Sequence, residues 1–497
     1  MSDNDQPRTP VHLVVLLHGL YGAPANLWCL EAEAAALHEE LRKGSGESGE
    51  SDVERSTDDA DDVSAPAPQL AVLVAKSYVG QRTWDGIDVN AHRAADEIDE
   101  EIARLDAEGK DVVAFSVTGY SLGGLIARAL IGHLHTRTPS FFATHRPAAF
   151  STIATPHLGV LRYGSWKNTA VHAIGQHLFS RTGRQLYLLD TDKALPKKGN
   201  NRPLLTVLSD PEGIYLTALR LFPSVTILAN GVNDLTVPYP TAAIVDHDPY
   251  IEHEAGAVCV EVDEHNIVTR HYLHETEVDE VEAVVEASSG DSSPKQPGVS
   301  PARALPKAVR PWLPPVFFLP WRGPLRYALF PLIPFLLPLV LTFVAVTFTL
   351  HSFQSAERIR LHSSSGTRRL LHGLTHPTED NDDEGNGKDA NEAVDDDNDD
   401  SSSTGNGAET PALAPQSPGT QPLLSTEQRA MIRNLSAVPQ LERVVAWFPA
   451  VFNSHATIVA RNANVPRFAF QTQGIPVVRE WARRVVVAGN GVIGKED

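Results

Sequence analysis

The chain has few cysteines and a shortage of basic residues, and each shortage argues against a class of protein. Two cysteines, Cys29 and Cys259, occur in 497 residues, which is too few for a disulfide framework. Lysine and arginine total 42 against 62 acidic residues, a formal net charge of −20, and no basic stripe offers a surface to nucleic acid. No positively charged and then apolar leader follows Met1. We therefore expect a protein that is not secreted, faces the cytosol and has no nucleic-acid partner.

Segments without apolar periodicity divide the chain. Residues 44–68 are rich in glycine, serine, proline and acidic residues, and residues 379–407 form an acidic low-complexity run. Such compositions bury too little apolar surface to fold, so we expect insertions within one interrupted domain. The expected parts are a first domain part at 10–275 with a disordered insertion at 44–68, a linker at 276–310, an apolar segment at 311–350, an acidic disordered insertion at 351–424 and a final domain part at 425–490.

The stretch Gly119-Tyr120-Ser121-Leu122-Gly123 is the most informative in the chain, because it joins an apolar run to a helical pattern. Residues 112–117 are apolar enough for a strand that is buried on both faces. Residues 125–130 place apolar side chains at helical spacing. A serine at such a junction occupies a tight turn that exposes its hydroxyl, and the flanking glycines let helix and strand approach closely. This pattern predicts Ser121 as a nucleophile, with Gly119 and Gly123 as the glycines of the nucleophile elbow.

A second apolar run, residues 11–17, ends in His18-Gly19-Leu20-Tyr21-Gly22. In α/β-hydrolases the loop after such a strand gives one backbone N–H to the oxyanion hole, and the residue after the nucleophile gives the other. The predicted oxyanion hole therefore consists of the Leu20 and Leu122 amides. An ordinary strand-ending turn is the alternative interpretation of His18-Gly19.

The acid of a catalytic triad belongs just beyond the carboxyl end of a later strand. Residues 225–229 form an apolar run that leads into a loop rich in glycine, asparagine and proline, and this loop contains Asp234. A carboxylate there would accept the Nδ1–H of the histidine and stabilise the imidazolium. Asp234 is the predicted acid. A turn-forming role is the simpler alternative, and Asp246 and Asp248 are the other candidates.

The base is harder to choose among 20 histidines. The chain order serine, acid, histidine requires one downstream of Asp234. His455 is the predicted base, because it follows the strand-like residues 444–448 and precedes a closing amphipathic helix that contains Ile475 and Val478. The alternatives lie in an acidic stretch of the chain: His247, His253, His265, His271 and His274.

That acidic stretch could also be read as a metal site, because Asp246-His247-Asp248 is followed by Glu252-His253-Glu254. The spacing matches no standard ligand set, and a solvated loop explains it better. The chemistry of a serine nucleophile needs no metal or organic cofactor, and we expect none.

Five segments together resemble the putative serine esterase family of α/β-hydrolases, most closely its fungal intracellular lipases of the monoacylglycerol lipase or lipid-droplet phospholipase type. The resemblance covers roughly residues 10–275 and 425–490. It implies an α/β-hydrolase fold with Ser121 as nucleophile, Asp234 as acid and His455 as base. The five segments are His-Gly-Leu-Tyr-Gly, Gly-Tyr-Ser-Leu-Gly-Gly, Ala-Thr-Pro-His-Leu-Gly, Asn-Asp-Leu-Thr-Val-Pro and Asn-Ser-His-Ala-Thr-Ile-Val.

Between Asp234 and His455 lies a run of 24 residues without a charge, 327–350. A straight helix of that length would be ~36 Å long, enough for a hydrocarbon core of ~30 Å, so the run predicts membrane association. A single crossing would separate His455 from Ser121. Prolines interrupt the first half of the run, so a re-entrant hairpin or a wedge in one leaflet is the expected topology.

The sequence thus predicts a membrane-associated serine lipase that hydrolyses the carboxylic esters of acylglycerols or phospholipids on a lipid droplet or the endoplasmic reticulum. Residues 159–210 form either a cap over the site or ordinary core. A deacylase of lipid-anchored proteins or glycolipids and a catalytically silent membrane scaffold are the alternative functions. The oligomeric state is left open.

Overall fold

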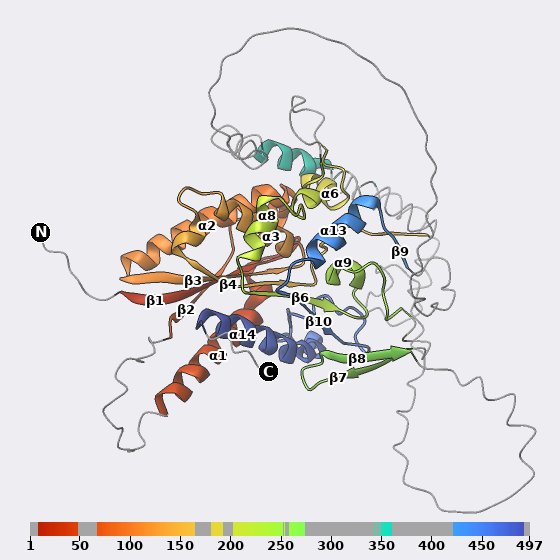
Figure 1. The fold of residues 1–497 in the computed structure, drawn as a ribbon. Coiled ribbons are helices and arrows are strands. Elements are labelled where there is room, and N and C mark those ends of the chain that lie inside the picture. The colour runs from red at the N-terminus through yellow and green to blue at the C-terminus, as the bar shows by residue number, and fades with distance from the viewer. Residues whose placement is uncertain are drawn as a thin grey trace, which may run out of the picture. The chain divides into compact units, whose positions relative to one another are not determined.

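Figure 1 shows a computed structural model of the 497-residue chain. One compact unit consists of residues 1–272 and 351–497, and a second consists of residues 273–350. The first unit contains the central sheet and all the predicted site residues. The structure describes residues 8–47, 67–164, 180–191, 202–251, 253, 258–273, 342, 346, 349–359 and 421–491.

Six strands form the central sheet in the order β10-β6-β4-β3-β1-β2, and every neighbouring pair is parallel. The inner strands are buried along most of their length, as parallel strands are when helices cover both faces. The predicted α/β class with a mostly parallel sheet is confirmed. The strands are β1 (Thr9–Leu17), β2 (Gln69–Val74), β3 (Lys110–Tyr120), β4 (Arg146–Ile153), β6 (Ser224–Asn230) and β10 (Leu441–Ala446).

Helices cover both faces of the sheet (Figure 1). The helices α1 (Trp28–Glu47) and α14 (Ile475–Gly489) pack together on one face. On the other face lie α2 (Ile87–Ala107), α3 (Leu122–His135) and α8 (Ile214–Arg220). Successive side chains of β1 point to opposite faces, as the pleat requires. Val15 and Leu17 therefore join the core beneath α2 and α3, whereas Val14 and Leu16 join the core beneath α1 and α14.

Shorter elements connect this framework. The 3-10 helices are η1 (Pro24–Leu27), η2 (Gly80–Trp84) and η8 (Pro466–Gly474), and the short α-helices are α4 (Phe141–Thr144), α6 (Ser180–Leu186), α7 (Leu204–Val207), α9 (Tyr239–Ala243) and α13 (Thr426–Ser436). Two pairs of strands lie outside the central sheet: β5 (Arg162–Tyr163) with β9 (Pro422–Leu423), and β7 (Val258–Val262) with β8 (Val268–Leu273).

The strand order places the ends of β1 and β3 where a ligand is expected. β1 lies between β2 and β3, so the chain leaves β1 toward one edge of the sheet and returns on its other side. In open parallel sheets, ligands bind outside the carboxyl ends of the strands at such a reversal. The His18–Gly22 loop follows β1 and Ser121 follows β3, so both predicted site segments lie at this position.

Two described helices overlap the ends of segments expected to be insertions. α1 extends through Glu47, within the expected 44–68 segment, and residues 48–66 lie outside the described part. Residues 351–359, at the start of the expected 351–424 segment, are helical. Ser355 on this helix hydrogen-bonds Asp85, which is 270 residues away, and no local composition reveals a contact of that kind.

The linker at 276–310 and the apolar segment at 311–350 lie outside the described residues, except that positions 342, 346, 349 and 350 are helical. Within the part of the chain that the structure describes, no helix has the length and apolar character needed to cross a bilayer. The evidence for membrane association therefore remains the sequence of the 327–350 run.

The described parts of the 159–210 segment contact the rest of the domain. Leu186 and Leu188 pack partly buried against the core beneath α2 and α3. Gln185 Oε1 accepts the Ile87 amide at 2.7 Å, and Gly86 N donates to Thr182 Oγ1 at 3.0 Å. This segment is therefore attached to the start of α2.

Candidate active site

Ser121 occupies the turn between β3 and α3 in a backbone conformation that L residues rarely adopt. Its φ is 56° and its ψ is −125°, and strain of this kind is found at functional sites. The flanking glycines have no room for a side chain. A Cβ on Gly119 would lie 2.3 Å from the Gly123 carbonyl oxygen, and a Cβ on Gly123 would lie 2.1 Å from the Leu17 oxygen. The close approach of strand and helix therefore explains both glycines of the elbow.

Ser121, His455 and Asp234 form a continuous hydrogen-bonded chain. His455 Nε2 lies 3.1 Å from Ser121 Oγ, and His455 Nδ1 lies 2.9 Å from Asp234 Oδ2. With Nδ1–H donating to the carboxylate, Nε2 is the atom that can accept the serine proton. Ser121 and His455 are 8% and 7% exposed, and the Asp234 side chain is 2% exposed, so bulk water has little access to these bonds.

Asp234 is held by the loop that contains it. Its Oδ1 accepts the backbone amides of Thr236 at 2.9 Å and Val237 at 2.8 Å, and Asn230 Nδ2 donates to Oδ2 at 2.8 Å. Together with the bond to His455, these contacts satisfy both carboxylate oxygens. These bonds fix the orientation of the carboxylate, so that Oδ2 faces the imidazole of His455.

His455 is held from both sides. The Tyr120 hydroxyl donates to the His455 carbonyl oxygen at 2.9 Å, and the two rings lie 5.1 Å apart between centroids. Burial raises the pKa of Tyr120 far above its usual value, so its hydroxyl stays protonated and remains a donor. Asn453 Oδ1 accepts the His455 amide at 3.2 Å, and Ser454 Oγ donates to the Val232 oxygen at 2.7 Å. These bonds connect the histidine loop to β3 and to the loop after β6.

The loop after β1 lies beside Ser121. A Cβ on Gly19 would come within 2.7 Å of Ser121 Cβ, so the segment that contains Leu20 is in contact with the serine. Leu122 opens α3, and the first N–H groups of a helix have no acceptor within that helix. Both predicted oxyanion amides therefore belong to segments next to the Ser121 side chain.

Two of the alternative histidines contact aromatic side chains near the β7–β8 hairpin. His271 packs on Tyr250 at 5.3 Å, and His253 packs on Trp447 at 5.2 Å. His265 lies between β7 and β8. His455 is the histidine that the structure hydrogen-bonds to Ser121, and His274 lies outside the described residues.

The two alternative acids occupy other surroundings. Asp246 binds the exposed His247 ring at 2.7 Å. Asp248 accepts the Tyr250 amide at 2.9 Å, and burial raises its pKa to about 6. Among the residues that the structure describes, no cluster of three or more histidine, cysteine and acidic side chains has a metal-binding arrangement.

Sequence reasoning did not find the residues that orient the triad. Asn230 and Asn453 each precede a site residue by a few positions, whereas Tyr120 is part of the elbow itself. An asparagine four residues before the predicted acid is a usable signal, since it ends the strand from which the acid loop begins. The role of Tyr120 had no signal in the sequence, because its partner is 335 residues away.

Comparison with known proteins identifies related sequences for this part of the chain. Residues 7–244 match the sequence profile of the putative serine esterase family. The matched range includes the serine and acid segments but ends before His455. The resemblance noted from the motifs is therefore confirmed at the level of the family.

Fungal proteins are among the similar sequences. The putative lipase C4A8.10 of Schizosaccharomyces pombe is 33% identical over 130 residues, which is 26% of this chain and 16% of that protein. The putative lipase ROG1 of Saccharomyces cerevisiae is 28% identical over 250 residues, 50% of this chain and 30% of that protein. The putative lipase YDL109C of the same yeast is 30% identical over 175 residues, 35% of this chain and 25% of that protein. The matches thus span at most about a third of these relatives' lengths.

Proposed function

We propose that the chain is a serine esterase that hydrolyses lipid esters with Ser121, His455 and Asp234. The premise of the proposal is that residues 7–244 match the putative serine esterase family. One observation carries the proposal: the His455 ring joins Ser121 Oγ to Asp234 Oδ2 through hydrogen bonds of 3.1 Å and 2.9 Å. A serine and a histidine in this contact, with the histidine oriented by a third group, form an activated nucleophile.

The acylation step follows from the hydrogen bonds. Ser121 Oγ attacks the ester carbonyl carbon while its proton moves to His455 Nε2. Asp234 accepts the Nδ1–H throughout and stabilises the imidazolium without taking the proton. The carbonyl oxygen becomes an oxyanion, which the Leu20 and Leu122 amides stabilise. Collapse of the tetrahedral intermediate expels the alcohol, which takes the proton from Nε2.

The deacylation step reverses these roles with water as the nucleophile. His455 Nε2 takes a proton from water as the water attacks the acyl-serine carbonyl, and then returns the proton to Ser121 Oγ as the fatty acid leaves. The products are a carboxylic acid and an alcohol, and Ser121 is regenerated. No metal or organic cofactor takes part in this scheme.

We propose acylglycerols or phospholipids as the substrate class and a lipid droplet or endoplasmic reticulum membrane as the location. Two observations support this choice: the similar fungal proteins are named lipases, and residues 327–350 form a 24-residue run without a charge. Because Ser121 and His455 lie on opposite sides of that run in the sequence yet hydrogen-bond each other, the proposed topology returns the chain to the side from which it entered.

Three experiments test the proposal. A fluorophosphonate probe should label the wild-type protein and not Ser121→Ala, and hydrolysis of mono-, di- and triacylglycerols and phospholipids should identify the substrate. An unlabelled wild-type protein would indicate a silent scaffold, and activity on acylated protein alone would indicate a deacylase. In sealed membranes, protease sites engineered near Gly290 and Gly405 should be cut from the same side; cleavage of one and protection of the other would rule out the returning topology.

A further inference from the structure

Asp85 is a buried carboxylate that plays no part in the triad. Its side chain is fully buried and forms ion pairs with Arg93 on α2 at 2.8 Å and with Arg358 at 2.7 Å. Ser355 Oγ donates a third contact at 2.7 Å. Since Arg358 and Ser355 follow Asp85 by more than 250 positions, this carboxylate attaches a distant helix to the hydrolase.

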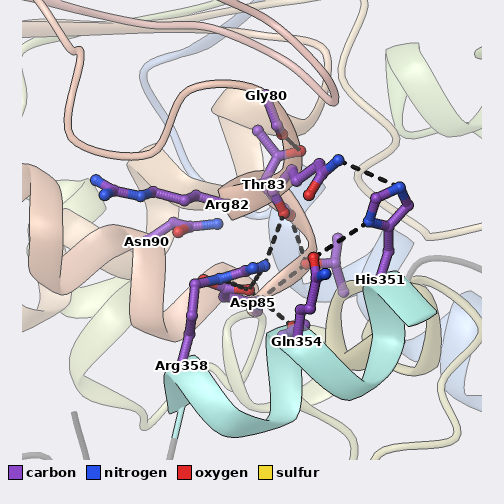
Figure 2. Close-up of polar contacts among 12 residues, drawn as sticks. Gly80, Arg82, Thr83, Asp85, Asn90, His351, Gln354 and Arg358 are labelled. Carbon is purple, nitrogen blue, oxygen red and sulfur yellow. Dashed lines mark hydrogen bonds and ion pairs between the residues drawn. The ribbon is translucent and has the colours of Figure 1, made fainter. Parts of the chain in front are cut away.

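The attached helix comprises residues 349–359 and presents one polar face to the hydrolase. Figure 2 shows His351, Gln354 and Arg358 projecting from that face toward the segment Gly80–Asp85. His351 Nε2 lies 3.2 Å from Gln81 Nε2, and its ring packs on Trp84 with centroids 5.7 Å apart. Polar and charged side chains therefore form the inner face of this helix.

Two large apolar side chains of the same helix are exposed. Leu350 and Phe353 are 56% and 69% exposed, and Glu357, one turn after Phe353, is exposed as well. A soluble helix normally has the reverse arrangement, with apolar residues inward and polar residues outward. Large apolar side chains that are exposed together can mark a surface that contacts an apolar partner.

The Gly80–Asp85 segment also connects this helix to the proposed oxyanion loop. Gly80 N donates to the Gly22 oxygen at 3.0 Å, and the Tyr21 amide donates to Thr83 Oγ1 at 3.1 Å. The Tyr21 ring packs edge-on to Trp84 at 5.2 Å and is 49% exposed. The helix and the loop next to Ser121 are therefore attached to the same short segment.

Exposed apolar side chains also lie on the other side of Ser121. Leu235 directly follows Asp234 and is 58% exposed, and Phe452 in the histidine loop is 70% exposed. The Leu235 amide lies 3.5 Å from Asn453 Oδ1, so these two loops are neighbours. These loops follow the carboxyl ends of β6 and β10, and the loop that contains Tyr21 follows the carboxyl end of β1.

We propose that Tyr21, Leu235, Phe353 and Phe452 form a lipid-docking surface around the active site, and that Asp85 clamps the 349–359 helix in the orientation that places this surface on the lipid. This proposal rests on the proposed function and specifies how the enzyme meets its substrate. The partner is a lipid surface because the helix directly continues the uncharged run 327–350. The chain has a net charge of −20, so attraction to anionic lipid does not drive the docking. Burial of apolar area on the lipid is the driving force.

The docking surface is tested on the full-length protein with a cysteine-reactive, environment-sensitive dye. Phe353→Cys and Phe452→Cys are labelled in a Cys259→Ser background, so that Cys259 does not react with the dye. Cys29 can stay, because burial raises its pKa to about 12 and keeps that thiol unreactive. Phosphatidylcholine vesicles should shift the emission of both labels to shorter wavelength, equally at low and high salt. The matched control is Leu221→Cys, 40% exposed just before β6 at the opposite edge of the sheet, which should not respond. The absence of an emission shift at position 353 would refute the proposal. A shift caused by higher protein concentration without vesicles would refute it as well, because it would indicate that a second copy of the chain covers the surface.

The clamp is tested by comparing two esters, one soluble with a short chain and one embedded in phosphatidylcholine vesicles. Arg358→Gln should lower the ratio of vesicle to soluble hydrolysis about tenfold, because the reacting groups are no longer held at the lipid surface. Vesicle flotation should persist, because the 327–350 run is intact. Ser355→Ala should have a smaller effect in the same direction, and Arg137→Gln, which breaks the ion pair with Asp99, should have none.

An unchanged ratio in Arg358→Gln, with the melting temperature retained, would refute the clamp, as would a parallel fall in both rates. The dye measurement separates this inference from the proposed function. If wild-type protein hydrolyses neither ester while the label at position 353 still reports lipid, the esterase proposal fails and the docking surface stands.

Discussion

Asp234 and His455 are 221 residues apart in the sequence, yet Asp234 Oδ2 lies 2.9 Å from His455 Nδ1. The acid follows β6 and the histidine follows β10, and these two strands pair in parallel from Leu441↔Val225 to Ala446↔Asn230. Because the carboxyl ends of paired parallel strands meet at one edge of the sheet, the register of this pair brings the two loops together.

Asp234→Asn should reduce kcat by up to about 10⁴-fold while preserving the fold. The amide can still accept from the Thr236 and Val237 N–H groups, but its NH₂ group favours the imidazole tautomer that cannot accept the serine proton. Steady-state hydrolysis and thermal melting of the purified variant measure the two effects. A variant that retains a tenth of the wild-type rate would move the acid role to another residue.

His455→Ala should lower kcat by about 10³-fold or more, to the residual rate that an oxyanion hole alone supports. His265→Ala and His271→Ala serve as controls and should retain most of the activity, because those histidines lie at the β7–β8 hairpin. If either control is inactive and His455→Ala is active, the geometry described here does not support the reaction.

Gly19→Ala should lower kcat by about 10- to 100-fold, because the new methyl group would lie 2.7 Å from Ser121 Cβ and displace the serine. Gly109→Ala is the contrasting variant. Gly109 has a φ of 73° and open space around its Cβ position, so alanine there should cost about 1 kcal/mol of stability without changing kcat. Equal effects of the two variants on kcat would contradict the inference that Gly19 affects turnover through its contact with Ser121.

The stability of the protein should fall as the pH decreases from 6.5, in part because of His12. Burial and the nearby Arg146 lower the pKa of His12 to about 3. The folded-state pKa is lower than the unfolded one, so between pH 6.5 and 3 the unfolded chain binds the extra proton. The His12 contribution is complete above pH 6.5 and is lost toward pH 3, by up to about 1.4 kcal/mol per pH unit.

His12→Gln removes this titration and leaves an amide that can still pair with Ser116 Oγ, which lies 2.8 Å from His12 Nε2. Urea unfolding in a nonionic detergent between pH 6.5 and 4.5 should give a smaller slope of unfolding free energy against pH for the variant. Identical slopes for wild type and variant would show that His12 is not buried as a neutral ring.

The sequence by itself was sufficient for the class of fold and for the elements that contain the site. Local signals explain this success: continuous apolar runs predict buried strands, and Gly119 and Gly123 mark a turn that only glycine permits. The sequence could place Asp234 just beyond β6 because a strand precedes it and turn-forming residues surround it. These features depend on neighbouring residues, which a sequence displays directly.

Only the tertiary structure decided which histidine contacts Ser121, what holds His455, and that residues 349–359 are attached to the hydrolase. Each of these depends on atoms that are hundreds of positions apart: Tyr120 and His455 by 335, Ser121 and His455 by 334, and Asp85 and Ser355 by 270. A hydrogen bond between distant segments leaves no periodicity in either one. The register of the parallel sheet brings the triad together, and the buried charge of Asp85 is satisfied by a helix in a segment whose composition predicts an insertion.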